Sequence, residues 1–117
     1  YGIISPNQNI YRKEGVAEED QTIKPVSYSV VKHGIMGLTK YLATYWGKKG
    51  VRVNTLCPAS LQNGQDPEFI EKLSALVPMG RMSRPDEYPA TVLYMLSDAS
   101  SYMTGATVVL DGGRTIW

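Results

Sequence analysis

The sequence has almost no cysteine or histidine. Its 117 residues include one of each, Cys57 and His33. A single cysteine cannot form an internal disulfide, so a reducing cytoplasmic setting is the simplest expectation. One cysteine and one histidine are too few ligands for a protein-built zinc site, and we expect no metal.

The sequence also lacks an excess of charge and any long apolar run. Lysine and arginine number 12 against 11 acidic residues, for a net charge of +1. This balance gives no electrostatic reason to expect a nucleic acid or an anionic membrane as a partner. No apolar stretch approaches the ~20 residues of a membrane span. The composition, 43% hydrophobic and 20% charged, is typical of a globular protein.

What the sequence does contain is an alternation of helical and strand patterns. Residues 1–24 carry turn-forming residues and a charged patch, which indicate an irregular loop. The segments with regular periodicity are a helix over 26–46, a strand over 51–57, helices beginning at 66–67 and 84–85, and a strand over 107–110. This order predicts an α/β fold with a parallel sheet and crossover helices.

The long helix is expected to bury a broad apolar face. Pro25 marks its entry, and Ser27 is expected to cap it. The apolar positions at helical spacing are Val31, Ile35, Leu38, Leu42 and Trp46. In the last helix Pro89 predicts a distorted first turn, and the expected core residues are Val92, Leu93, Met95 and Leu96.

Tyr28 and Lys32 stand out within the long helix. They are four residues apart and therefore lie one turn apart on the same face. A neighbouring positive charge favours the phenolate form of tyrosine, so Tyr28 can serve as a general acid or base. The same spacing is also common for a packed ring beside a solvated charge, so the pair depends on its context. The loop over 58–64 supplies context, because it follows a strand at the end where ligands bind in open α/β sheets.

Taken together, several segments resemble the short-chain dehydrogenase/reductase family. Residues 28–32, Tyr-Ser-Val-Val-Lys, match the Tyr-x-x-x-Lys motif of the family. Residues 80–87, Gly-Arg-Met-Ser-Arg-Pro-Asp-Glu, resemble its Gly-Arg-x-x-x-Pro-x-Glu signature. Residues 51–58 resemble the strand and proline turn between them, and 97–113 resemble the closing segment. The resemblance covers residues 25–113 in the order of the family.

The resemblance implies an oxidoreductase that moves a hydride between NAD or NADP and a carbonyl or alcohol substrate. It makes Tyr28 the catalytic acid or base and Lys32 its helper, and both would also contact the cofactor. The residues that would pack on the nicotinamide are Pro58, Ala59, Ser60 and Leu61, the backbone of Leu61 meeting the carboxamide. The resemblance of residues 1–24 also implies a sugar-like substrate, and we expect a homo-oligomer.

Two parts of the family pattern are missing from this sequence. There is no glycine-rich phosphate loop, and Gly112-Gly113 ends a strand without a following helix. The catalytic serine of the family is expected just before residue 1, with Ser5 as a weaker candidate. We therefore expect the chain to be the C-terminal, substrate-side portion of a Rossmann-like doubly wound domain. Two strands and three to four helices are an incomplete domain. We therefore expect the chain to be inactive alone, without the missing N-terminal half.

Two other interpretations stay open. A nucleotide-sugar epimerase or dehydratase shares the Tyr-x-x-x-Lys pair, and a non-catalytic assembly module would keep the helices for subunit contact. Among single residues, His33 is expected to be structural, Cys57 to fill the core, and Arg81 to tie the loop before the last helix. Tyr102 and Trp117 are expected to serve packing or subunit contacts.

Overall fold

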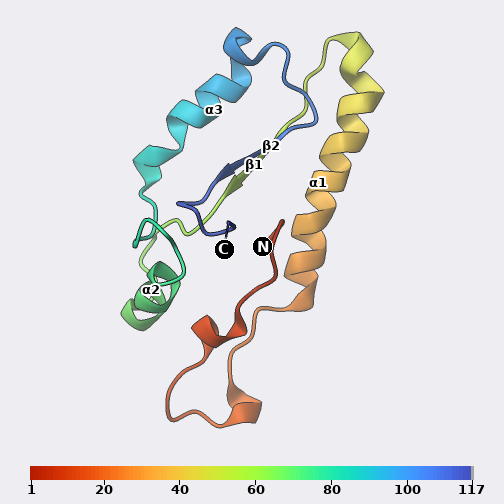
Figure 1. Ribbon diagram of the computed structural model, residues 1–117. Helices are drawn as coiled ribbons and strands as arrows, with labels where there is room; N and C mark the ends of the chain where they lie inside the picture. The colour runs from red at the N-terminus through yellow and green to blue at the C-terminus, as the bar shows by residue number, and fades with distance from the viewer. Residues whose placement is uncertain (117) are drawn as a thin grey trace.

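The fold is a pair of parallel strands flanked by helices (Figure 1). The computed structural model describes residues 1–116, so the expectation for Trp117 lies outside the described residues. The strand pair runs between α1 on one side and α3 on the other. The bounds are α1 (Val26–Trp46), β1 (Thr55–Pro58), α2 (Pro67–Ser74), α3 (Pro89–Leu96) and β2 (Thr107–Leu110). The predicted α/β class with a parallel sheet is confirmed.

The first strand begins later than its sequence pattern indicates. β1 pairs with β2 in parallel from Thr55 opposite Thr107 to Pro58 opposite Leu110. Just before it, the side chain of Asn54 donates to the carbonyl of Met103 at 2.9 Å and accepts from the N–H of Ala106 at 3.0 Å. The asparagine side chain thus replaces the backbone ladder, and the predicted strand over 51–57 is wrong at its start.

The long helix α1 has the predicted length but not the predicted cap. Pro25 occupies the N-cap position with φ −66° and ψ 145°, and no side chain caps the helix. Ser27 already lies inside the first turn, so the cap assigned to it is wrong. At the other end the chain leaves the helix through Gly50, whose φ of +77° suits glycine.

The apolar faces of α1 and α3 are largely exposed. Val31 and Leu38 in α1 are 60% and 55% exposed, and Leu93 and Leu96 in α3 are 69% and 77% exposed. The prediction that these faces are buried within this chain is therefore wrong. A sheet of two strands covers too little of either helix to bury these faces.

The predicted distortion at Pro89 is present, but the helix predicted to begin at 84–85 begins only at Pro89. A short 3₁₀ turn spans Pro85–Glu87, and α3 begins at Pro89. Proline has no N–H and a fixed φ, so it fits the first turn of a new helix better than the middle of a continuing one. α2 begins in the expected way, with the Asp66 carboxylate accepting from the N–H of Glu68.

The main cluster of buried side chains forms around α2. Ile10, Leu73 and Met82 form it, and Tyr11, Phe69, Ile70 and Leu76 pack around them. Two short 3₁₀ turns, over Gln8–Tyr11 and Glu18–Asp20, interrupt the segment predicted to be irregular. The first of these turns is docked against α2, so the opening segment helps to build the region around the sheet end.

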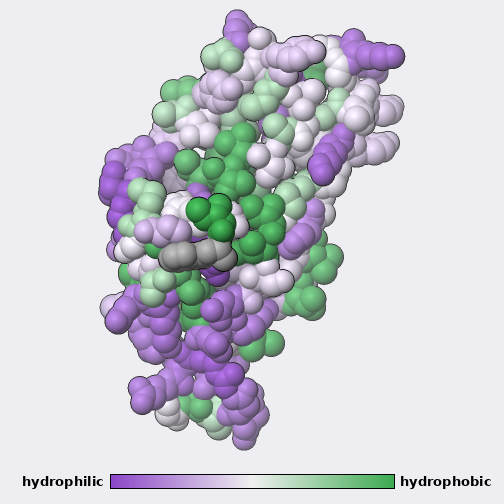
Figure 2. Space-filling model, in the orientation of Figure 1, coloured by the Kyte–Doolittle hydropathy of each residue, from purple (hydrophilic) through white to green (hydrophobic). Residues whose placement is uncertain are grey.

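The surface separates into an apolar centre and a hydrophilic end. Figure 2 shows hydrophobic side chains gathered near the middle of this face and hydrophilic ones toward the end where the opening loop lies. Among the described residues, none of the helices has both the length and the apolar character to cross a membrane.

Candidate active site

Tyr28 and Lys32 face the same cavity from the first two turns of α1. The cavity encloses about 400 Å³. The Nζ atom of Lys32 lies 5.4 Å from the centroid of the Tyr28 ring. The Tyr28 side chain is 37% exposed, so its phenol is open to a ligand rather than sealed in the core.

The loop that follows β1 forms the opposite wall of this cavity. All four residues predicted to contact a cofactor lie there, namely Pro58, Ala59, Ser60 and Leu61. The fold therefore brings together every site residue predicted from the sequence, although 30 positions separate the Tyr28 helix turn from Pro58.

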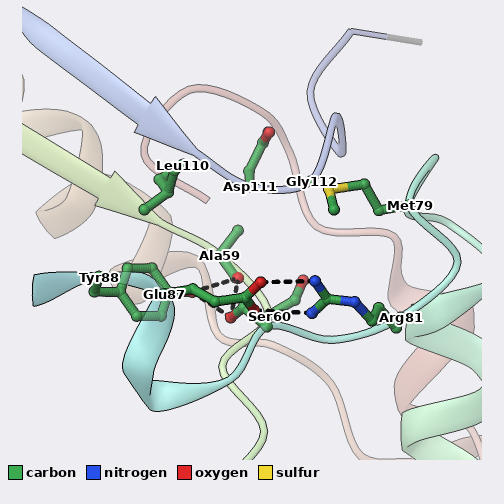
Figure 3. Close-up of a pocket in the computed structure, with 10 residues that line it drawn as sticks. Ala59, Ser60, Met79, Arg81, Glu87, Tyr88, Leu110, Asp111 and Gly112 are labelled. Atoms are coloured by element: carbon green, nitrogen blue, oxygen red, sulfur yellow. Dashed lines mark hydrogen bonds and ion pairs between the residues drawn. The ribbon is translucent and has the colours of Figure 1, made fainter. Parts of the chain in front are cut away.

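This loop leaves the strand through a left-handed residue. Ser60 has a φ of +61°, which is uncommon for a residue with a side chain. The turn is held from outside, because the carbonyl of Ala59 accepts hydrogen bonds from Ser83 Oγ at 3.2 Å and Tyr88 Oη at 3.0 Å. The N–H of Ser83 also donates to the carbonyl of Ser60 at 2.9 Å. Tyr88 reaches this loop beside a small cavity that it helps to line (Figure 3), and the volume of that cavity is about 80 Å³.

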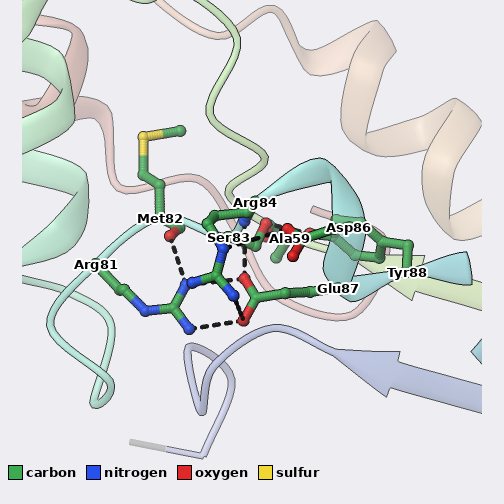
Figure 4. Close-up of polar contacts among 8 residues, drawn as sticks. All are labelled: Ala59, Arg81, Met82, Ser83, Arg84, Asp86, Glu87 and Tyr88. Carbon is green, nitrogen blue, oxygen red and sulfur yellow. Dashed lines mark hydrogen bonds and ion pairs between the residues drawn. The ribbon is translucent and has the colours of Figure 1, made fainter. Parts of the chain in front are cut away.

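An ion pair fixes the segment that carries Ser83 and Tyr88. Arg81 makes a bidentate contact with Glu87, at 2.8 Å and 2.6 Å, and the N–H of Arg84 donates to the same carboxylate (Figure 4). The hydrogen bonds from Arg81, then from the Arg84 backbone, lower the pKa of Glu87 to about 2. Arg81 thus ties the loop, as the sequence analysis expects.

Several residues of the cavity were not predicted from the sequence. The Nζ atom of Lys24 lies 3.9 Å from the centroid of the Tyr28 ring, closer than Lys32. Tyr1 meets the Tyr28 ring edge-on at 6.2 Å between centroids. Arg114 lines the cavity from the segment after β2. Tyr1 and Arg114 share no periodic pattern with Tyr28. Lys24 has helical spacing to Tyr28, four residues away, but Pro25 separates it from the helix, so the sequence offers no reason to group them.

Tyr11 closes one side of the cavity with a protonated phenol. Its hydroxyl donates to the hydroxyl of Tyr1 at 3.0 Å. Burial raises the pKa of Tyr11, and the hydrogen bond to Tyr1 raises it further. Tyr11 is therefore suited to hydrogen bonding and packing rather than to proton transfer.

Other residues singled out in the sequence do not enter the site. His33 points back along α1, with Nδ1 2.9 Å from the carbonyl oxygen of Ser29. Ser5 is not among the residues that line the cavity. Cys57 is half-buried and lines the cavity wall, so it is not the core residue that was expected. Within residues 1–116 no group of three or more acidic, cysteine or histidine side chains could hold a metal ion.

A sequence profile of the family described as enoyl-(acyl carrier protein) reductase matches residues 14–115. Galactitol 2-dehydrogenase (L-tagatose-forming) of Cereibacter sphaeroides is 40% identical over 97 residues, which are 78% of this chain and 38% of that enzyme. D-threitol dehydrogenase of Mycolicibacterium smegmatis is 40% identical over 96 residues, or 78% of this chain and 37% of that enzyme.

The fold matches solved structures of the same kind. A short chain dehydrogenase from Leptospira borgpetersenii, solved with bound NAD+, superposes with a TM-score of 0.86 at 33% identity. The match covers 98% of this chain and 41% of that one. The chain therefore spans about two fifths of the length of the relatives that it matches.

Proposed function

Because this chain belongs to the short-chain dehydrogenase/reductase family, we propose that it is the substrate-side portion of an NAD(P)-dependent oxidoreductase. The reaction moves a hydride between a nicotinamide cofactor and an alcohol or carbonyl. Residues 1–117 form one part of a Rossmann-like domain, and a glycine-rich segment elsewhere in the same domain holds the rest of the dinucleotide. The observation that carries this proposal is the position of Tyr28 and Lys32 opposite the loop after β1, across one cavity.

The donors around the cavity fit the nicotinamide end of a dinucleotide. Among the described residues, no acceptor bonds the backbone N–H of Leu61, although the neighbouring Gln62 N–H donates to Ser83. A free N–H on a fixed loop suits the carboxamide oxygen of a nicotinamide. Lys32 has no carboxylate partner within residues 1–116, so its ammonium donors are available for ribose hydroxyls.

Leu61, Lys32 and the loop from Pro58 would hold the cofactor, and when bound the nicotinamide supplies the site's capacity for hydride exchange. Tyr28 holds a proton on its hydroxyl and gives it to, or takes it from, the substrate oxygen. Lys32 stabilises the phenolate that remains when the proton has left.

The substrate is a small alcohol or carbonyl compound, and we propose a sugar-like one. The two curated relatives named above are, by name, dehydrogenases of galactitol and threitol. We place the protein in the cytoplasm as a homo-oligomer, on the grounds of its single cysteine and its exposed apolar helix faces. The epimerase and assembly-module alternatives are not favoured, because the relatives found are dehydrogenases and reductases and the Tyr28–Lys32 pair opens on a cavity.

The test is to replace the phenol in the complete polypeptide that carries these residues. Tyr28→Phe removes the transferable proton but keeps the ring, and we expect NAD(P)-linked turnover to fall by about 10²–10⁴-fold. The measurement is the absorbance of the reduced nicotinamide with galactitol and threitol as substrates. Tyr41→Phe, on an exposed ring of the same helix, is the matched control and should leave turnover unchanged. Full turnover in Tyr28→Phe would exclude the proposed role.

A further inference from the structure

The cavity beside Tyr28 carries more positive charge than the proposed proton transfer uses. Lys24, Lys32 and Arg114 all line it. Lys32 has a role beside the phenol, but Lys24 and Arg114 have none in that chemistry. Neither side chain forms an ion pair within residues 1–116.

The described lining holds one acid, which offsets only one of these three cations. It is Asp111, and its Oδ1 and Oδ2 atoms accept hydrogen bonds at 2.9 Å from the backbone N–H groups of Gly113 and Thr115. Asp111 thus stabilises the turn after β2. The cavity keeps a net positive charge, which raises the local concentration of anions.

Lys24 is held in place by a backbone clamp. The side-chain amide of Gln8 accepts from the N–H of Lys24 at 2.9 Å and donates to its carbonyl at 3.2 Å. This pair of bonds closes the opening loop across 16 positions. From this backbone the Lys24 ammonium lies 3.9 Å from the centroid of the Tyr28 ring and 5.9 Å from that of Tyr11. The cation is therefore placed beside the very phenol that must meet a substrate oxygen.

An ammonium in this position can still bind an anion. Contact with the face of a ring attracts the cation but leaves N–H donors free, since the ring accepts through its π face. A guanidinium such as that of Arg114 binds carboxylates in a bidentate manner. Both side chains are half-buried, so their attraction for a negative group is stronger than in open solvent.

We propose that Lys24 and Arg114 form an anion subsite that binds the carboxylate of a hydroxy-acid or keto-acid substrate, with the reacting oxygen at Tyr28. This inference rests on the proposed function. It narrows the substrate class from sugar-like alcohols and carbonyl compounds in general to those that also carry a carboxylate. A phosphate group of the cofactor is also an anion, so the same two cations suit it as a ligand. The substrate is the better occupant because Lys24 lies against the Tyr28 ring, where the substrate and not a phosphate must sit.

The test compares two six-carbon probes that differ at one end. D-gluconate carries a carboxylate where D-glucitol carries a hydroxymethyl group. Their binding to the complete polypeptide is measured by calorimetry at low salt, with and without NAD+. We expect D-gluconate to bind at least about tenfold more tightly, as charge-assisted hydrogen bonds allow.

Variants test whether Lys24 and Arg114 cause the preference for D-gluconate over D-glucitol. Lys24→Gln and Arg114→Gln should each abolish most of it, and Lys24→Arg should retain it, which separates lost charge from lost folding. Lys40→Gln is the matched control, because Lys40 is exposed on α1 and lies outside the cavity lining. It should leave the preference unchanged.

Two results would overturn the subsite. One is equal binding of D-gluconate and D-glucitol by the unchanged protein. The other is a loss of NAD+ affinity in Lys24→Gln and Arg114→Gln without any effect on D-gluconate, which would assign the cations to a cofactor phosphate. Turnover in Tyr28→Phe tests the proposed function separately, because the carboxylate preference is read from binding and needs no turnover.

Discussion

At the scale of single residues, the hydroxyl of Tyr88 supports the loop that we propose contacts the cofactor. It donates to the carbonyl of Ala59 at 3.0 Å and contacts the hydroxyl of Ser83. These bonds hold the turn in which Ser60 takes its left-handed conformation. The position of the Leu61 N–H therefore depends on a residue that lies beyond the loop itself.

Tyr88→Phe tests this support. The variant keeps the ring and removes the two polar contacts, so we expect a loss of about 0.5–1.5 kcal/mol in the free energy of unfolding. The KM for NAD+ should rise more than kcat falls, because the change loosens binding without touching the proton donor. Urea unfolding and steady-state kinetics measure both effects. Tyr94→Phe, an exposed tyrosine in α3, is the control; equal effects of the two variants would contradict the support role.

The ion pair of Glu87 predicts how the stability of the protein changes at low pH. Its pKa is lowered from 4.5 to about 2 by the Arg81 and Arg84 contacts. A carboxyl with a depressed pKa in the fold adds stability above the pKa it has when unfolded, and loses it as pH falls through the folded value. The stability difference between the unchanged protein and Glu87→Gln should therefore be constant above about pH 5 and shrink between pH 4.5 and 2.

Thermal unfolding across pH 2–7 measures this difference. Glu71→Gln, which alters an exposed carboxylate of α2, serves as the control. Its difference from the unchanged protein should vary much less over the same range. If the stability difference between Glu87→Gln and the unchanged protein does not change with pH, ionisation of Glu87 does not stabilise the fold.

The sequence identifies the residues of the site that share a local pattern and misses those that do not. Tyr28 and Lys32 can be identified from the sequence because helical spacing places them on one face. The loop from Pro58 is visible because it ends a strand pattern. Lys24 is four residues from Tyr28 but lies before Pro25, outside the helical pattern, and Arg114 follows the last strand. Their places in the cavity wall depend on how the loop and the turn fold, which residue spacing does not show.

At the scale of elements, the turn after β2 is fixed by close packing. Gly112 has a φ of +64°, and a Cβ atom there would come within 2.8 Å of Val77 Cγ1. Val77 is itself 4% exposed and cannot move easily. The turn thus packs β2 against the segment after α2, and it also positions Asp111 and Arg114.

Gly112→Ala should destabilise the protein by about 1–3 kcal/mol, through strain at positive φ and the clash with Val77. Gly34→Ala in α1 is the matched control, because nothing lies within 4 Å of a Cβ at that position. It should be neutral or stabilise the helix by up to about 1 kcal/mol. Denaturant unfolding measures both, and a neutral Gly112→Ala would show that the turn adapts.

The sequence predicts the existence of the elements better than their ends. The 21-residue helix α1 and the strand β2 have the predicted bounds. α1 is a long periodic run between Pro25 and Gly47, and β2 is a short apolar run that ends at Asp111-Gly112. β1 starts late because the Asn54 side chain takes the place of the backbone ladder. Competition between side-chain and backbone hydrogen bonds is a local event that hydrophobic pattern does not report.

At the scale of the whole molecule, the chain is more extended than a domain of its length. Its radius of gyration is 16.9 Å and its extents are 56 × 28 × 25 Å. A compact domain of this size has a radius of gyration of roughly 13 Å. Among the described side chains none is fully buried. Together with the exposed apolar faces of α1 and α3, this shape is that of one side of a larger layered fold.

The last prediction concerns residues 1–117 in isolation. We expect them to self-associate, because apolar faces such as that of Leu93 and Leu96 lower their free energy by leaving water. Sedimentation at rising protein concentration should show oligomers of increasing size. The double variant Leu93→Glu, Leu96→Glu should form fewer of these oligomers. Calorimetry should detect weak binding of NAD+ or none, since the cavity is proposed to hold only the nicotinamide end. Tight, stoichiometric binding by a monomer would contradict the view that the dinucleotide is held mainly by another part of the domain.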